Sequence, residues 1–439
     1  MSSIAASATV DATSDPGPIY RKIAFRLIPL LMLLWVMAWV DRVNISFAKL
    51  QMMDELKFSE AVYGLGAGIF FLGYLVFEVP SNLLLQKIGA RGTIARIAIG
   101  WGVTCALMSV ATTPTMFYLL RFVLGSFEAG FFPGVILYLT LWFPSDRRAK
   151  VFGIFMSSVA LSGVLGGPIA GVIMSEMHTW LGLSGWKWLF IVEGIPTALI
   201  GLFSLFYLTN RLDEAHWLTQ REREIVADDL ERDRARLGDR EHDLMSALRD
   251  RRLWLFTFIY FCIVITNATV AFWGPTIIRT AGITGISTIG WIISGASLLG
   301  SAGMILNGFV ADRTGRPLIL GVVLLVIAGL AFCVVAGALH RSLEITVVAF
   351  AFALAAAYST VPIFWQLPNR LFVGTAAAGG IAIINSFGNL GGFLAPYALG
   401  VAATRTGDIT AGLVVVGAVA AIAALRILIT RRFFAPGTV

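Results

Sequence analysis

Runs of about 20 mostly apolar residues recur along the whole chain, separated by short polar breaks. An α-helix needs a run of about this length to cross a hydrocarbon core of roughly 30 Å. Every backbone N–H and C=O must be paired inside a bilayer, and a helix achieves this within one segment. The pattern therefore predicts an all-α integral membrane protein.

The number of runs predicts twelve transmembrane helices. The composition agrees, because 57% of the 439 residues are hydrophobic and only 13% are charged. The predicted crossings are 24–47, 61–84, 93–111, 115–142, 150–175, 188–209, 253–278, 286–311, 317–339, 343–366, 374–402 and 411–430.

The longest polar break, 210–252, divides the predicted helices six and six. Its many charges of both signs are typical of a solvated linker with one or two surface helices. The predicted organisation is an N-terminal tail (1–23), a first six-helix bundle (24–209), this linker, a second six-helix bundle (253–430) and a C-terminal tail (431–439).

Basic residues are distributed unevenly between the two ends of the predicted helices. If both termini lie in the cytoplasm, most of the 33 lysines and arginines fall in cytoplasmic segments, as the positive-inside rule requires. We therefore expect a multi-pass protein of the cell (inner) membrane with both termini cytoplasmic and the lipid bilayer around it. The formal net charge of +7 follows from this topology, so nucleic acid is not an expected partner.

The two halves of the chain carry similar short stretches at nearly one offset. GFVADRTGRP (308–317) corresponds to NLLLQKIGAR (82–91), and the glycine pair 391–392 corresponds to the pair 166–167. Many transporters are built from such internal repeats. The halves are therefore predicted to be two structural copies.

RFVLGSFEAGFFPG (121–134) places an arginine and a glutamate inside the fourth predicted helix. A charged side chain at membrane depth costs roughly 3 kcal/mol or more and is tolerated where it faces a polar interior and has a function. Arg121 and Glu128 are seven residues apart, so they share one helix face but lie beyond the reach of an i, i+4 pair. We expect both to be functional. A structural charge network with partners on other helices is the alternative.

The first predicted helix carries a second charged pair, Asp41 and Arg42. Adjacent residues point about 100° apart on a helix, so we expect one to line a cavity and the other to contact a neighbouring helix. The second half has acids only at or beyond its predicted helix ends, so proton coupling is expected in the first half. The other embedded acids, Glu78 and Glu193, are interpreted as structural or gating residues.

The loop GFVADRTGRP closely resembles the signature loop of the major facilitator superfamily, and the stretch 82–91 resembles a degenerate first copy. The resemblance implies the superfamily's fold, with two six-helix bundles that give alternating access to a central site. It also implies that the loop latches the outward-facing state. The latch residues so implied are Gly308, Asp312, Arg313, Gly315, Arg316, Gly89 and Arg91.

Several other stretches are similar to the anion:cation symporter group of this superfamily. They are DRVNISFA (41–48), GYLVFEVPSNLLL (73–85), WKWLFIVEGIPT (186–197) and NSFGNLGGFLAP (385–396). Members described as tartrate, phthalate or hydroxyphenylacetate permeases resemble the chain most. The resemblance implies import of a small organic anion, such as a sugar acid, a tartrate-like dicarboxylate or an aromatic acid, by proton symport.

The same resemblance implies roles for four charged residues. Asp41 and Glu128 match the protonation sites of the group, and Arg42 and Arg121 match arginines that bind the anion or couple it to protonation. Our hypothesis is that protonation of Glu128 frees Arg121 for charge-assisted hydrogen bonds to a substrate carboxylate.

The second half is expected to recognise the rest of the substrate. Asn389 matches an asparagine that contacts substrate in the group. Further candidates offer rings or amides to a small anion, with packing or interhelical hydrogen bonding as the alternative. These candidates are Tyr74, Trp365, Gln366 and Asn267.

Sequence signatures of enzymes and metal proteins are not found. The chain has no phosphate-binding loop, no HExxH motif and no Ser/His/Asp pattern, and its three cysteines are interpreted as packing residues. We therefore expect a monomeric transporter without enzyme activity, metal or other cofactor. A carboxylate/carboxylate exchanger without net proton coupling is the main alternative function, and a ligand sensor is a more distant one.

Overall fold

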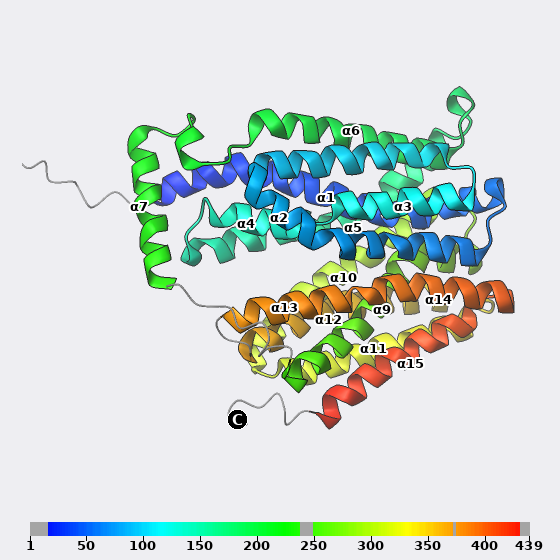
Figure 1. Cartoon of the computed structure of the whole chain (residues 1–439). Coiled ribbons are helices and arrows are strands. Elements are labelled where there is room, and N and C mark those ends of the chain that lie inside the picture. Colours follow the sequence, from blue (N-terminus) through cyan, green and yellow to red (C-terminus); the bar gives the residue numbers. More distant parts are fainter. Residues whose placement is uncertain (1–15, 238–248, 372–374, 431–439) are drawn as a thin grey trace, which may run out of the picture.

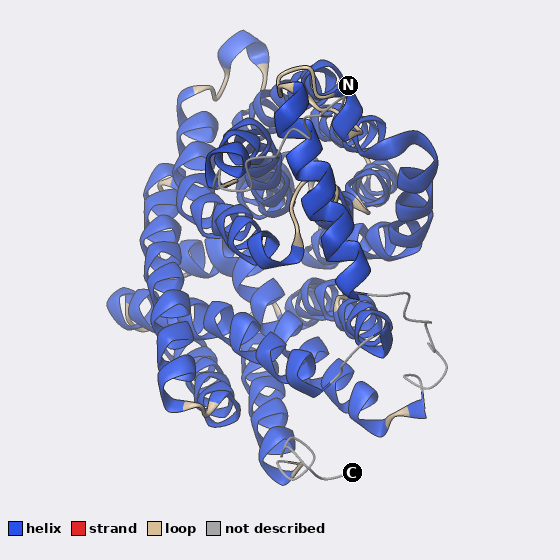
Figure 2. Cartoon of the chain, turned by 90° about the vertical axis from the view of Figure 1, so that its left-hand side faces the viewer, coloured by secondary structure: helices blue, strands red, loops and turns tan. Residues whose placement is uncertain are grey.

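The computed structural model describes residues 16–237, 249–371 and 375–430, and all regular structure among them is helical (Figure 2). Eleven segments in these ranges are long and apolar enough to cross a membrane. The remaining predicted crossing consists of two shorter helices, α13 (Thr375–Gly388) and α14 (Leu390–Thr406). The predicted twelve-helix, all-α architecture is confirmed.

The first six crossings form one bundle (Figure 1). Its second and third crossings are one long helix with a kink at Gly89, where φ is 80° and ψ is 167°. A residue without Cβ adopts this conformation without steric cost. The helices are α1 (Gly17–Leu56), α2 (Glu60–Leu107), α3 (Pro114–Glu128), α4 (Phe131–Thr140), α5 (Ser145–Glu176) and α6 (Gly185–Tyr207).

The fourth predicted crossing is broken into α3 and α4. Gly130, between them, has a φ of 85°, and a Cβ there would lie 2.4 Å from the Ser81 hydroxyl oxygen. The break makes Glu128 the last residue of α3. An embedded carboxylate thus lies where regular backbone pairing stops.

The last six crossings form a second bundle, which lies beside the first (Figure 1). Gly315, with a φ of 64°, ends the second helix of this bundle in the left-handed conformation typical of helix C-termini. In addition to α13 and α14, the helices are α9 (Arg251–Thr280), α10 (Ile286–Thr314), α11 (Pro317–Ala338), α12 (Leu343–Leu371) and α15 (Thr410–Ile429).

The two bundles meet mainly where α5 packs on α10 and where α14 packs on the first part of α2. A Cβ on Gly167 would lie 2.4 Å from the carbonyl oxygen of Gly290, and one on Gly400 would lie 2.4 Å from that of Glu60. Each contact joins the fifth crossing of one half to the second crossing of the other half. The interface therefore has the pseudo-twofold arrangement that an internal repeat produces.

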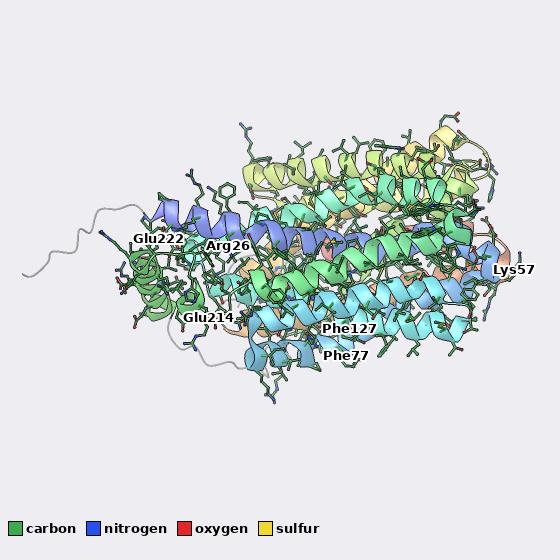
Figure 3. The ribbon with its side chains drawn as sticks, turned by 90° about the horizontal axis from the view of Figure 1, so that it is seen from above. Arg26, Lys57, Phe77, Phe127, Glu214 and Glu222 are labelled. Atoms are coloured by element: carbon green, nitrogen blue, oxygen red, sulfur yellow. The ribbon has the colours of Figure 1, made fainter. Side chains whose placement is uncertain are left out.

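The two ends of the molecule differ. We name one the Lys57 end, after the residue between α1 and α2, and the other the α7 end, after helix α7 (Gln220–Leu237) (Figure 3). At the Lys57 end the bundles are joined by polar contacts, among them a 2.8 Å hydrogen bond from the Ala61 N–H to Thr404 Oγ1. The molecule is therefore closed at this end.

Helix α7 lies in the predicted linker and docks on the first bundle. The Tyr20 hydroxyl donates to Asp229 at 3.0 Å, Lys22 pairs with Glu222 at 2.8 Å, and the rings of Trp142 and Trp217 stack. These contacts also explain why α1 begins at Gly17 and not near residue 24. Its first turns contact α7 through Tyr20 and Lys22.

Asp233 attaches α7 to the start of α5. Its carboxylate accepts a hydrogen bond from the Ser145 hydroxyl and another from the Ser145 backbone N–H at 3.0 Å. These bonds, followed by the charges of Arg148 and Arg236, hold the pKa of Asp233 below its ordinary value of 3.8 despite some desolvation. A carboxylate with a lowered pKa stabilises docking above its ordinary pKa, and this contribution is lost as the pH falls through the lowered value.

We expect Asp233→Asn to loosen α7 by about 1 kcal/mol, because charge-assisted hydrogen bonds are lost. The docked-to-undocked ratio should then fall about fivefold, measured as faster amide hydrogen exchange in α7 at neutral pH. Asp228→Asn is the matched control, since the Asp228–Arg232 pair is exposed and such pairs contribute little. Equal exchange in both variants would contradict the role of Asp233.

Candidate functional site

An ion pair between Arg42 and Glu128 joins α1 to the end of α3. Arg42 Nη2 contacts Glu128 Oε1, and the two side chains are 12% and 1% exposed. Among the described residues, Arg42 Nε and Glu128 Oε2 have no hydrogen-bond partner. Both groups therefore have hydrogen-bonding capacity left for a ligand or a proton.

Three aromatic rings surround the Arg42 guanidinium. Its central carbon lies 4.8 Å from the ring centre of Trp39, 5.2 Å from that of Phe70 and 5.6 Å from that of Tyr74. Cation–π attraction holds the charge there without occupying its N–H donors. Since a guanidinium has five such donors, Arg42 can bind a second carboxylate while it remains in place. Tyr74, a candidate substrate residue from the sequence, thus lies beside the Arg42 guanidinium.

Arg121 has different partners from those the sequence suggested. It is fully buried, its Nε donates to the Gly66 carbonyl oxygen at 3.1 Å, and its Nη2 donates to that of Ala67 at 3.5 Å. Gly125 permits this approach of α3 to α2, because a Cβ there would lie 2.0 Å from the Phe70 carbonyl oxygen. The partner of Glu128 is Arg42 and not Arg121 in this conformation.

Asp41 points to a different neighbour from Arg42, as expected for adjacent residues on a helix. Its side chain is 2% exposed, and its Oδ1 accepts a hydrogen bond from the Cys105 thiol with an S–O distance of 2.6 Å. Asp41 Oδ2 has no partner among the described residues. Cys105 was predicted only to be a packing residue, and nothing in its spacing indicates this contact.

The second bundle contributes an aromatic cluster. The Trp365 ring lies 5.0 Å from that of Tyr260, and Tyr260 is also an electrostatic neighbour of Tyr74 in the first bundle. A Cβ on Gly388 would lie 2.2 Å from the Tyr260 ring, which places the α13–α14 junction at Asn389 against this cluster. Tyr74, Trp365 and Asn389 thus belong to one region between the bundles.

Two amide candidates differ in their contacts. Asn267 Nδ2 donates to the carbonyl oxygens of Ile263 at 2.9 Å and Ala357 at 3.0 Å, which matches the alternative of an interhelical hydrogen bond. Gln366 Oε1 is buried and has no partner within the described ranges. Of the two, Gln366 has the free acceptor that a substrate hydroxyl could use.

The two copies of the signature loop are held differently. In the first copy the Asn210 side chain accepts from the Arg91 backbone N–H at 2.9 Å, and a Cβ on Gly89 would lie 2.6 Å from the same oxygen. In the second copy, the exposed Asp312 makes no ion pair with another described residue. The other residues predicted for that latch are Gly308, Arg313, Gly315 and Arg316, and all but the partly buried Gly308 are exposed.

Lys49 is a residue that the sequence reasoning missed. It is 3% exposed, pairs with Glu60 at 2.7 Å and donates to Thr276 Oγ1 of the second bundle at 3.0 Å. Its ammonium nitrogen also lies 3.9 Å from the ring centre of Trp273 on α9. A buried charge thus bridges the bundles at the Lys57 end. Lys49 lies beyond the first predicted crossing, 24–47, because the apolar run ends before it.

Comparison with known proteins agrees with this architecture. Residues 30–396 match the family described as the Major Facilitator Superfamily. The chain belongs to this superfamily. A solved structure of the same fold is a bacterial homologue of the human lysosomal transporter Spinster, with a TM-score of 0.73 at 15% sequence identity, covering 95% of this chain and 98% of that one.

Relatives of higher identity cover nearly the whole chain. A protein of Agrobacterium vitis named "Putative tartrate transporter" is 44% identical over 94% of this chain and 91% of its own length. "Putative metabolite transport protein NicT" of Pseudomonas putida is 41% identical over 93% and 94%. This superfamily member is therefore a multi-pass membrane protein and a secondary transporter of small organic molecules, not an enzyme.

We expect Lys49→Met to shift the transporter about tenfold toward conformations open at the Lys57 end. The variant loses a hydrogen bond to Thr276 and a cation–π contact with Trp273 between the bundles, together worth about 1.4 kcal/mol. Spin labels on the exposed residues Lys57 and Arg405 lie on different bundles. Pulsed electron resonance between these labels should show a larger population of long distances in the variant.

Lys187→Met is the matched control for this measurement. Lys187 pairs with Glu55 at 2.9 Å at the same end of the molecule, but both residues belong to the first bundle. We expect this variant to keep the wild-type distance distribution. The same distribution in Lys49→Met would show that Lys49 does not hold the bundles together.

Proposed function

We propose that the protein imports a small organic anion, with at least one carboxylate, by proton symport through alternating access. The observation that carries this proposal is the ion pair of Arg42 and Glu128, which lies among aromatic rings and is only partly satisfied. The Arg42 guanidinium faces the Glu128 carboxylate. A substrate carboxylate can take the place of Glu128 as the partner of Arg42. A proton on Glu128 makes that replacement favourable.

Proton and anion support each other's binding in this scheme. While Glu128 is ionised, Arg42 is paired, and an incoming anion would leave the glutamate unpaired in a buried site, which is costly. Protonation of Glu128 removes its charge and frees Arg42 for charge-assisted, bidentate hydrogen bonds to the substrate. By linkage, a bound anion in turn favours the proton.

The proposed conformational cycle rests on the difference between the two ends of the molecule. We infer that the Lys57 end faces outward and the α7 end faces the cytoplasm, since the positive-inside rule places the basic segments there. Proton and anion enter while the Lys57 end is open. The bundles then close at Lys49, as in this structure, and both ligands leave toward the α7 end, where Asp312 of the signature loop makes no ion pair with another residue that the structure describes.

The residues around the proposed site support a class of substrate. Arg42 supplies one cationic centre, and Tyr74, Trp365 and Gln366 supply apolar faces with polar atoms. Relatives of this chain are named as tartrate transporters. A hydroxylated dicarboxylate such as tartrate is therefore the first compound to test, followed by sugar acids and aromatic acids.

Transport by purified protein in liposomes tests the proposal. Labelled tartrate, a sugar acid and an aromatic acid are offered with and without an inside-alkaline pH gradient, at zero membrane potential. Accumulation of one of them only with the gradient is the expected result. Uptake that ignores the gradient but increases with carboxylate preloaded inside would replace symport with exchange.

A further inference from the structure

Glu193 is a buried acid that the site described above does not use. It lies on α6, is 8% exposed, and neither of its carboxyl oxygens has a hydrogen-bond partner among the described residues. An ionised carboxylate in such surroundings costs several kcal/mol, so the neutral acid is favoured in this conformation. A buried acid held neutral can release its proton when its surroundings change.

Contacts one turn further along α6 fix its register against α1. Thr197 Oγ1 donates to the Glu193 carbonyl oxygen at 2.7 Å, and the same hydroxyl lies 3.7 Å from Met37 Sδ. Met37 and Asp41 are four residues apart on α1 and so share one face. On α6, Glu193 shares a face with Thr197 for the same reason.

Contacts about one turn before Glu193 complete the register. The Cys105 sulfur lies 3.6 Å from the Phe190 carbonyl oxygen and 2.6 Å from Asp41 Oδ1. α6 therefore touches the Met37 turn of α1 on one side of Glu193 and reaches Asp41 through Cys105 on the other side. These two contacts place Glu193 beside Asp41, which is its charged neighbour.

Close packing of α6 on α2 encloses Glu193 within the first bundle. A Cβ on Gly194 would lie 2.5 Å from the Gly102 carbonyl oxygen, and one on Gly102 would lie 2.7 Å from that of Gly194. Within the described residues, helix α6 packs mainly on elements of the first bundle, on the side away from the second (Figure 1). Glu193 therefore lies apart from the region of Trp365, whereas Asp41 is adjacent to Arg42 in sequence and faces Glu128.

Few charged groups surround Asp41 and Glu193. Among the described residues, the titratable groups that face Glu193 are Asp41 from α1 and Cys105 from α2, and α5 and η1 (Met108–Val110) present none. Asp41 is faced in addition by Glu128 and Arg121 of α3. Within the part of the chain that the structure describes, no lysine or arginine is therefore available to pair with Glu193.

We propose that Asp41 and Glu193 form one proton-binding pair, so that Glu193 carries protons in the transport cycle together with Asp41. This inference deepens the proposed symport and rests on it. It departs from the expectation of a structural or gating role, because two unpaired carboxyl oxygens beside another acid stabilise no structure. Two neighbouring carboxyl groups titrate as a unit, because the charge of one raises the affinity of the other for a proton.

The cycle of this pair is balanced in protons. With one proton, Glu193 is the acid and Asp41 is the carboxylate that accepts from Cys105. Glu193 releases its proton when the site opens toward the α7 end, and both carboxyl groups are then ionised. A proton taken up from the side open at the Lys57 end restores the first state.

Glu193→Gln tests the pair, because glutamine imitates a permanently neutral acid. In liposomes, the pH of half-maximal gradient-driven uptake should shift by about one unit or more to lower pH, since Asp41 loses the group that shares its proton. Uptake just above the wild-type midpoint should then fall about tenfold. Infrared difference spectra between high and low pH should lose part of the protonated-carboxyl signal of the wild type, a readout that requires no substrate.

Glu176→Gln is the matched control, since Glu176 is an exposed acid at the end of α5. The control should keep the wild-type midpoint and spectrum. A Glu193→Gln protein with the wild-type midpoint and infrared signal would overturn the pair while leaving symport intact. Failure of symport itself is recognised separately, because the wild-type protein would then move no protons with its substrate.

Discussion

Arg42→Gln is expected to reduce gradient-driven uptake at least about 100-fold, while Arg42→Lys reduces it about tenfold. Glutamine removes the charge that binds the substrate carboxylate, and loss of one partner of a buried, hydrogen-bonded charge pair costs about 2–5 kcal/mol. Lysine keeps the charge but lacks the planar fork that binds a carboxylate bidentately. Initial uptake rates in liposomes, with equal amounts of folded protein, measure both effects.

The double variant Arg42→Gln/Glu128→Gln separates substrate binding from a structural role. Arg42→Gln alone leaves the carboxylate of Glu128 buried and unpaired, so the protein should also lose stability. Removing the glutamate charge in the double variant should restore the melting temperature. If Arg42 binds substrate, uptake stays lost in the stable double variant, whereas recovered uptake would show that Arg42 only neutralises Glu128.

Arg341 supplies the control for non-specific effects of removing an arginine. It is exposed, next to the start of α12. Arg341→Gln should therefore transport at the wild-type rate. A comparable loss in this variant would mean that the Arg42 result reflects altered membrane topology.

The twelve crossings could be predicted because apolar length alone decides whether a helix can span a bilayer. The backbone conformations at the ends of these helices could not be predicted. Hydropathy carries no information on the sign of φ, so the kink at Gly89 and the break at Gly130 left no signal in the apolar runs. The break matters for the site, because it makes Glu128 the last residue of α3.

The sequence placed Arg121 and Glu128 on one helix face, but it could not predict which residues they contact. Helical periodicity shows which residues share one face of one helix, so Arg121 and Glu128 were taken together. Which residue of another helix lies opposite depends on how closely the helices pack, and here Gly125 brings Arg121 to the carbonyls of α2. Glu128 therefore pairs with Arg42. The resemblance to a transporter group did not specify this pairing either.

The sequence does not distinguish Glu193 from other embedded acids. From the sequence it is one more embedded acid near a helix end, and only the absence of donors around both carboxyl oxygens among the described residues distinguishes it. Burial of a polar group without a partner is a three-dimensional property. Residues with this property therefore have to be found in the structure.

Glu128→Gln is expected to lower accumulation about tenfold while substrate exchange continues. The amide cannot hold a negative charge, so Arg42 is permanently free and the anion binds without a proton at this position. For each coupled proton, a gradient of one pH unit supplies about 1.4 kcal/mol, enough for about tenfold accumulation at zero membrane potential. The variant should therefore accumulate about tenfold less substrate than the wild type, yet exchange labelled for unlabelled substrate at a rate near that of the wild type. Wild-type accumulation in Glu128→Gln would remove this residue from the coupling mechanism and leave Asp41 and its neighbours to carry the proton.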